Sequence, residues 1–182
     1  MNLFRTIIFT PFFAVAVSGC ITIDPRSLHE NVRADSAESI VGTFGNSASY
    51  KSSGGLSGFV ASDTLSFALG LHLASSSFSI ARPSKSELKI EFHKVDGSSF
   101  VKLYSTSTDL KIKPNGQFDL SVPEGCGGHD SPGFGCGYKT VTLFINESGD
   151  LASIESGGAA GVLGIIPFAM YVKKLAIFPR LE

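Results

Sequence analysis

Alternation of apolar and polar residues limits how this chain can fold more than any other feature. Between positions 88 and 93, Leu, Ile and Phe alternate with Lys, Glu and His, the two-residue period of a strand with one buried face. Asp96-Gly97 follows and predicts a tight hairpin. Short apolar runs between turn signals recur to the end of the chain, so the pattern favours an antiparallel sheet over a helical bundle.

The full set of runs predicts about eight strands, near residues 40–44, 88–93, 100–104, 110–113, 118–122, 138–145, 151–155 and 171–178. One short helix is expected after the first strand, near Asp63 to Leu73, with Asp63 as its cap. A twisted meander of this size tends to curl and so remove its exposed edges. We therefore expect a mainly β fold, an eight-stranded antiparallel meander curled into a barrel or half-barrel. Its interior would hold apolar side chains such as Leu88, Ile90, Phe92, Leu103 and Phe118.

The charge balance excludes one class of partner. Fifteen basic and 16 acidic residues give a formal net charge of −1, whereas a nucleic-acid binder needs a basic face. Apolar residues make up 43% of the chain, enough to bury a core.

The first 19 residues read as an export signal and not as part of the fold. Arg5 lies in a weakly positive start, and residues 6–19 then carry no charge. This run is shorter than the roughly 20 apolar residues of a membrane-spanning helix.

The end of this segment, Val17-Ser18-Gly19-Cys20, resembles the lipobox of bacterial lipoproteins. The resemblance implies cleavage before Cys20, a diacylglyceryl thioether on its sulfur and an acyl chain such as palmitate on its amine. Several acyl chains anchor a protein stably. Ile21 stands where an inner-membrane retention signal would have Asp, so the resemblance implies an outer-membrane location facing the periplasm. An ordinary secretory signal with a chance cysteine is the alternative.

Two further segments stand out by their charge content. Residues 20–39 carry charges of mixed sign and are expected to form a lipidated, solvated tether, so the β-domain would comprise residues 40–182.

The segment from Gly157 to Val172 is uncharged, rich in Gly and interrupted by Pro167. We expect a loop with an apolar tip that packs into the core or lines a cavity mouth; a membrane span is the alternative.

Short motifs after Cys20 show a second resemblance, to whole proteins and not only to their signals. Gly-Thr-Phe-Gly-Asn at 42–46, Ser-Glu-Leu-Lys-Ile-Glu-Phe at 86–92 and Gly149-Asp150-Leu151 are similar to segments of a class of small uncharacterised outer-membrane lipoproteins. That class brings no catalytic residues to this chain. The Gly-x-aromatic first strand is also similar to that of lipocalins, although Phe44 stands where they usually have Trp.

Cys126 and Cys136 remain once Cys20 is lipidated, and they bracket nine residues rich in Gly. Because the periplasm is oxidising, we expect a disulfide. A metal site formed by both thiols with His129 and Asp130 is the alternative, but paired zinc cysteines are usually two to four residues apart. The four histidines show no ligand spacing, so no metal or cofactor is expected.

These patterns favour a protein that is not an enzyme, because no nucleophile, base or phosphate-binding loop stands out. The leading hypothesis is a lipid-anchored lipoprotein whose β-domain binds an envelope partner or supports the envelope. The alternative is a lipocalin-like carrier that holds a small apolar ligand in the barrel interior. An envelope hydrolase is the third hypothesis.

Overall fold

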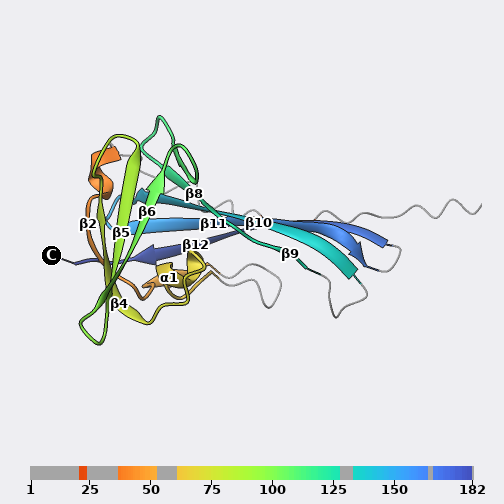
Figure 1. Cartoon of the computed structure of the whole chain (residues 1–182), viewed down its shortest axis with the longest axis horizontal. Helices are drawn as coiled ribbons and strands as arrows, with labels where there is room; N and C mark the ends of the chain where they lie inside the picture. Colours follow the sequence, from red (N-terminus) through yellow and green to blue (C-terminus); the bar gives the residue numbers. More distant parts are fainter. Residues whose placement is uncertain (1–20, 24–36, 53–60, 128–132, 164–165, 182) are drawn as a thin grey trace, which may run out of the picture.

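Two β-sheets share one hydrophobic core (Figure 1). The computed structural model describes residues 21–23, 37–52, 61–127, 133–163 and 166–181. The expectation of a mainly β fold is confirmed for these residues.

The large sheet has the order β1-β12-β11-β10-β8-β7, with β3 also on β12 and β9 also on β10. Its pairs are antiparallel except that of β1 with β12, which is parallel. The strands are β1 Ile21–Ile23, β3 Tyr50–Lys51, β7 Leu110–Ile112, β8 Phe118–Val122, β9 Cys126–Gly127, β10 Gly133–Ile145, β11 Leu151–Leu163 and β12 Ile166–Phe178.

The small sheet is antiparallel and has the order β13-β2-β4-β5-β6. Its strands are β2 Gly42–Gly45, β4 Ser75–Ala81, β5 Glu87–Lys94, β6 Ser99–Ser105 and β13 Arg180–Leu181. A 3₁₀ helix, Ala37–Ile40, precedes β2, and its Ile40 side chain is buried in the core.

The expected barrel is wrong, because neither sheet closes. The small sheet ends at β6 and the large sheet ends at β7, so the turn between these consecutive strands carries the chain from one sheet to the other. At the other crossing, Pro179 separates β12 from β13. Proline donates no ladder hydrogen bond, so one sheet stops there and the next begins.

The expected helix is shorter than the sequence predicted and lies within the predicted range of residues 63–73. The α-helix α1 covers Leu65–Ala68, and Thr64, not Asp63, caps it by accepting a hydrogen bond from the Phe67 amide. Gly70 has a φ of +71° and ends the helical path. The helix does not directly follow the first predicted strand, because Tyr50–Lys51 forms the strand β3 between β2 and α1.

The hairpin turns agree with the sequence. Gly97, Gly116 and Gly149 have positive φ at the turns β5–β6, β7–β8 and β10–β11. Leu88, Ile90 and Phe92 are buried as expected, but Leu103 is not. It pairs with Lys89 on the outer face of the small sheet, while its neighbour Tyr104 pairs with Leu88 and faces the core.

Phenylalanine fills the space between the sheets. The side chains of Phe44, Phe78 and Phe92 from the small sheet, and of Phe118 and Phe178 from the large sheet, are all fully buried. Phe78 lies within 6 Å, centroid to centroid, of three of the others. Burial of each ring contributes about 2–3 kcal/mol to folding, so these aromatic contacts join the two sheets.

The segment Gly157 to Val172 is not the expected loop. It forms the second half of β11 and the first half of β12, except for residues 164–165, which lie outside the described residues. Likewise, β10 begins five residues before the strand expected at Tyr138. The three long strands therefore extend well beyond the small sheet, to the right of Figure 1.

Candidate functional site: a β arm with a charged root

The outer part of the long strands forms an arm, defined as residues 133–138 of β10, 158–163 of β11 and 166–171 of β12. Its register runs row by row from the outer end as Gly133/Leu163/Ile166, Phe134/Val162/Pro167, Gly135/Gly161/Phe168, Cys136/Ala160/Ala169, Gly137/Ala159/Met170 and Tyr138/Gly158/Tyr171. None of the 18 residues is charged. The arm is therefore apolar or small on both faces.

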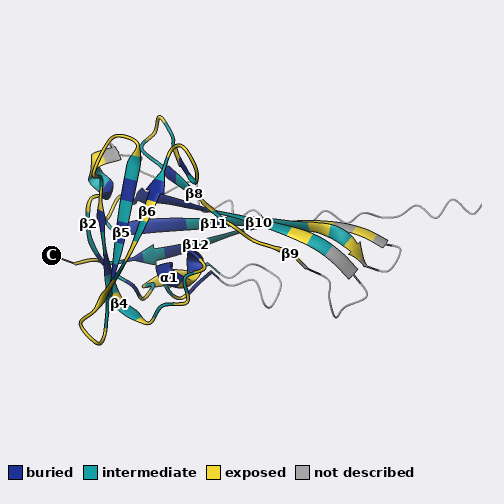
Figure 2. Cartoon of the chain, viewed as in Figure 1, coloured by how far each residue is buried: buried dark blue, intermediate teal, exposed yellow. Residues whose placement is uncertain are grey.

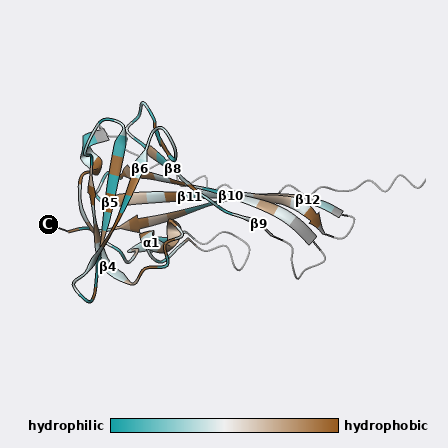
Figure 3. Cartoon of the chain, in the orientation of Figure 1, coloured by the Kyte–Doolittle hydropathy of each residue, from teal (hydrophilic) through white to brown (hydrophobic). Residues whose placement is uncertain are grey.

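Every arm residue whose exposure the structure describes is half-buried or exposed, whereas many residues between the two sheets are buried (Figure 2). Val162 is 43% exposed and Met170 is 37% exposed. Figure 3 shows strongly hydrophobic sequence at the outer end of β11. Glycine and alanine cannot build a core of their own, and among the residues that the structure describes no second layer covers this end of the sheet.

The innermost row of the arm is aromatic. Tyr138 and Tyr171 flank Gly158 across the three strands. A Cβ on Gly158 would lie 2.7 Å from the Tyr138 hydroxyl and 2.8 Å from the Met170 carbonyl oxygen. Only glycine leaves room for this packing, so Gly158 allows the Tyr138 ring to lie across β11.

Charged residues begin directly behind the aromatic row, at the root of the arm. Lys139, Lys173 and Glu155 occupy the next three rows towards the core. The Lys139 ammonium lies 2.9 Å from the Glu155 carboxylate. Glu155 is only 4% exposed, so this ion pair closes the end of the hydrophobic core from which the arm projects.

Ser62 completes the environment of Glu155. Its backbone N–H donates to Glu155 Oε1 at 2.6 Å, and its hydroxyl donates to Oε2 at 2.9 Å. Burial opposes ionisation of Glu155, but the hydrogen bonds and charge of Lys139 and the two donors of Ser62 outweigh it. Together they hold the pKa of Glu155 below its ordinary value.

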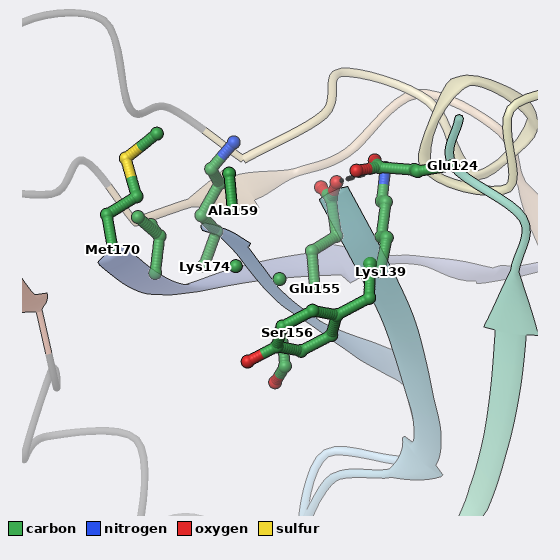
Figure 4. Close-up of a pocket in the computed structure, with 11 residues that line it drawn as sticks. Glu124, Lys139, Glu155, Ser156, Ala159, Met170 and Lys174 are labelled. Atoms are coloured by element: carbon green, nitrogen blue, oxygen red, sulfur yellow. Dashed lines mark ion pairs between the residues drawn. The ribbon is translucent and has the colours of Figure 1, made fainter. Parts of the chain in front are cut away.

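A shallow pocket of about 200 Å³ lies on this root (Figure 4). Glu124, Lys139, Glu155 and Lys174 give it a charged side, and Ala159, Met170 and Val172 give it an apolar side. Glu155 is already matched by a cation and two further donors, and such a carboxylate is not prepared to accept a proton. The pocket is therefore a boundary between polar and apolar surfaces without an evident acid–base pair.

The structure joins two of the three cysteines of the chain. The Cys126 and Cys136 sulfurs are bonded to each other, and the two residues face each other across β9 and β10. The bond fixes β9 along the outer edge of the arm. The alternative metal site would also need His129 and Asp130, which lie outside the described residues. Among the residues that are described, no three His, Cys, Asp or Glu side chains gather as a metal site.

Cys20 also lies outside the described residues, but the residue bonded to it does not. Ile21, Thr22 and Ile23 form β1, which pairs with Met170, Tyr171 and Val172 of β12. The start of the expected tether is thus a strand on the edge of the arm. Across the ranges that the structure describes, no helix has the length and apolar character needed to cross a bilayer.

Sequence reasoning missed the arm and the pairing of Glu155 with Ser62. Residues 157–172 carried a signal, the absence of charge, but their Gly and Pro content pointed to a loop. Glu155 and Ser62 are 93 positions apart, and no local pattern marks such a pair. Comparison with protein-family models, with curated proteins and with solved structures finds no match for this chain.

Proposed function

We propose that this chain is a lipoprotein of the bacterial outer membrane, anchored through Cys20, with a non-enzymatic β-domain that faces the periplasm. The observation that carries the proposal is the order of features at the amino terminus. A basic start, an uncharged run, two small residues and a cysteine follow each other as in lipoprotein signals. Each acyl CH₂ that enters the bilayer contributes about 0.8 kcal/mol, so such an anchor is stable.

The arrangement of the domain supports a binding or structural role rather than catalysis. At the root of the arm, Lys139 and the two donors of Ser62 neutralise and satisfy the buried Glu155 carboxylate, which stabilises this surface and does not prepare Glu155 to act as a base. The interior between the sheets is occupied by fully buried phenylalanines. The carrier hypothesis depended on an open barrel interior, and this packing gives it no support.

Metabolic labelling with a palmitate analogue tests the proposal. In a diderm bacterium that produces the full chain, the wild-type protein should incorporate the label and sediment with the outer membrane. The variant Cys20→Ser should incorporate none, because serine offers no sulfur for the thioether. A matched variant, Ser18→Ala, keeps a small residue before the cysteine and should be labelled like the wild type. Equal labelling of wild type and Cys20→Ser, or none in either, would contradict the proposal.

A further inference from the structure

The first described residues of the chain lie beside the root of the arm. Ile21 pairs with Met170, one row outside the Tyr138/Gly158/Tyr171 row. Consecutive Cα atoms are 3.8 Å apart, so a lipid on Cys20 would begin beside this row. The chain thus enters the described structure at the boundary between the apolar arm and its charged root.

The arm has the layered polarity of a segment that enters a bilayer. Five rows contain only glycine and apolar residues, the sixth contains Tyr138 and Tyr171, and Lys139 and Lys173 follow in the next two rows. Tyrosine is enriched at the boundary between hydrocarbon and headgroups, and lysine extends towards headgroups. Lys173 already lies over the Tyr171 ring, 6.0 Å from its centroid.

The length of the arm matches one leaflet. Five residue steps separate Tyr171 from Ile166 in β12, and about 3.4 Å per step gives about 17 Å. Half of a hydrocarbon core is about 15 Å, and a spanning strand needs about 9–11 residues. The arm is therefore long enough to enter one leaflet and too short to cross a bilayer.

Unpaired backbone groups are costly in hydrocarbon, and the edges of the arm are covered over part of their length. β9 pairs with β10 at Gly135 and Cys136, and the disulfide holds it in place. β1 covers β12 at residues 170–172. Pro167, farther out on β12, has no amide hydrogen to leave unpaired.

We propose that the arm inserts its outer five rows into the same leaflet that holds the acyl chains of Cys20, so that the protein has two membrane contacts side by side. This inference rests on the proposed lipid anchor. It assigns to Gly157 to Val172 a role that the anchor alone does not require. The two contacts would fix the orientation of the domain at the membrane, because one flexible tether leaves orientation free and two adjacent contacts do not.

Fluorescence of a probe attached to single cysteines tests the insertion. Val162→Cys lies in the arm, and Val101→Cys is its matched control, since Val101 is an exposed strand valine on the small sheet with a similar exposure of 47%. Each variant, purified from cells as the full processed chain and labelled with nitrobenzoxadiazole, is reconstituted into vesicles of phosphatidylethanolamine and phosphatidylglycerol. Emission is then measured with doxyl-labelled lipids and with aqueous iodide.

The probe at position 162 should emit at shorter wavelength than the probe at 101 and lose intensity to the doxyl lipids but not to iodide. The probe at 101 should behave in the opposite way. If iodide quenches both positions equally, the arm stays in water and the inference is wrong. Intact mass of the same samples reports separately on the anchor. Acylated protein with position 162 in water overturns only the insertion, whereas inserted but unacylated protein overturns the proposed anchor and leaves the arm as a membrane contact by itself.

Discussion

Ile21 is the parallel β-sheet partner of Met170. This pair joins the first described residue of the chain to the edge of the arm, 149 positions away in sequence. The start of the expected tether is therefore a strand. The residue proposed to carry the lipid, Cys20, precedes this strand directly and so lies close to the apolar arm of the large sheet.

An engineered disulfide should report this pairing. Directly opposed residues on neighbouring strands are close enough to bridge, since strands are about 4.8 Å apart. The double variant Ile21→Cys/Met170→Cys should therefore cross-link under mild oxidation. Ile23→Cys/Met170→Cys is the control, because Ile23 pairs with Val172, two residues farther along β12. Non-reducing mass analysis distinguishes the two. Equal cross-linking of both pairs would contradict the register.

The buried ion pair predicts a stability effect. Glu155→Gln removes the negative charge but keeps the shape, and it leaves Lys139 without its counter-ion in a mostly buried site. We expect the free energy of unfolding at neutral pH to fall by about 2–4 kcal/mol. Glu147→Gln, in the exposed turn between β10 and β11, should change it by less than about 0.5 kcal/mol. Urea unfolding measures both, and equal effects would contradict the role of the pair.

The same pair predicts how stability depends on pH. The pKa of Glu155 is lower in the folded chain than its ordinary value of 4.5, so the folded state binds fewer protons at this group than the unfolded state. The stabilisation is therefore complete above about pH 4.5 and is lost as the pH falls through the lower, folded value. Below pH 4.5 the wild type should lose stability more steeply than Glu155→Gln. Parallel curves for the two proteins would mean that Glu155 does not contribute.

The phenylalanine core predicts a contrast between two rings. Phe178 is fully buried and meets Phe78 edge to face, with centroids 5.9 Å apart. Phe178→Ala should lower the free energy of unfolding by about 3–5 kcal/mol, because it leaves a cavity where the two sheets meet. Phe67 on α1 is 54% exposed, and Phe67→Ala should cost less than about 1 kcal/mol. Thermal unfolding of the two variants tests whether one core holds both sheets, and equal losses would contradict it.

The disulfide should stabilise the arm more than the rest of the domain. It closes a loop of about ten residues, worth about 2–3 kcal/mol, and the loop lies on the outer part of β10. Reduction should speed amide hydrogen exchange at Gly137 by about 30- to 150-fold. The Leu143 amide, in the core portion of the same strand, should exchange at an unchanged rate. Faster exchange at both positions would show that the arm and the core unfold as one unit.

Local chemistry made part of this fold predictable. The period-two pattern of β5 and the turns at Gly97, Gly116 and Gly149 depend on residues within a few positions of each other. Leu103 was misplaced because β6 carries apolar residues on both faces, so its pattern alone does not say which one is buried. Pairing with β5 decides it.

The arm and its root depend on distant partners, and this is why the sequence did not predict them. Glycine, alanine and proline have weak strand propensity, yet residues 157–163 and 166–172 form strands because β11 pairs with β10 along one edge and with β12 along the other. The environment of Glu155 depends on Ser62, from a different part of the chain. The sequence shows that residues 157–172 carry no charge. It does not show that the strands they belong to project beyond the core, and that position is what makes the missing charge informative.

The central claim is that Cys20 carries the membrane anchor beside the arm, and the mass of the mature amino-terminal peptide tests it most directly. We predict a peptide that begins at Cys20, continues Ile21-Thr22-Ile23, and carries the added mass of a diacylglyceryl group and one amide-linked acyl chain. A peptide that begins before Cys20, or an unmodified Cys20, would contradict the account.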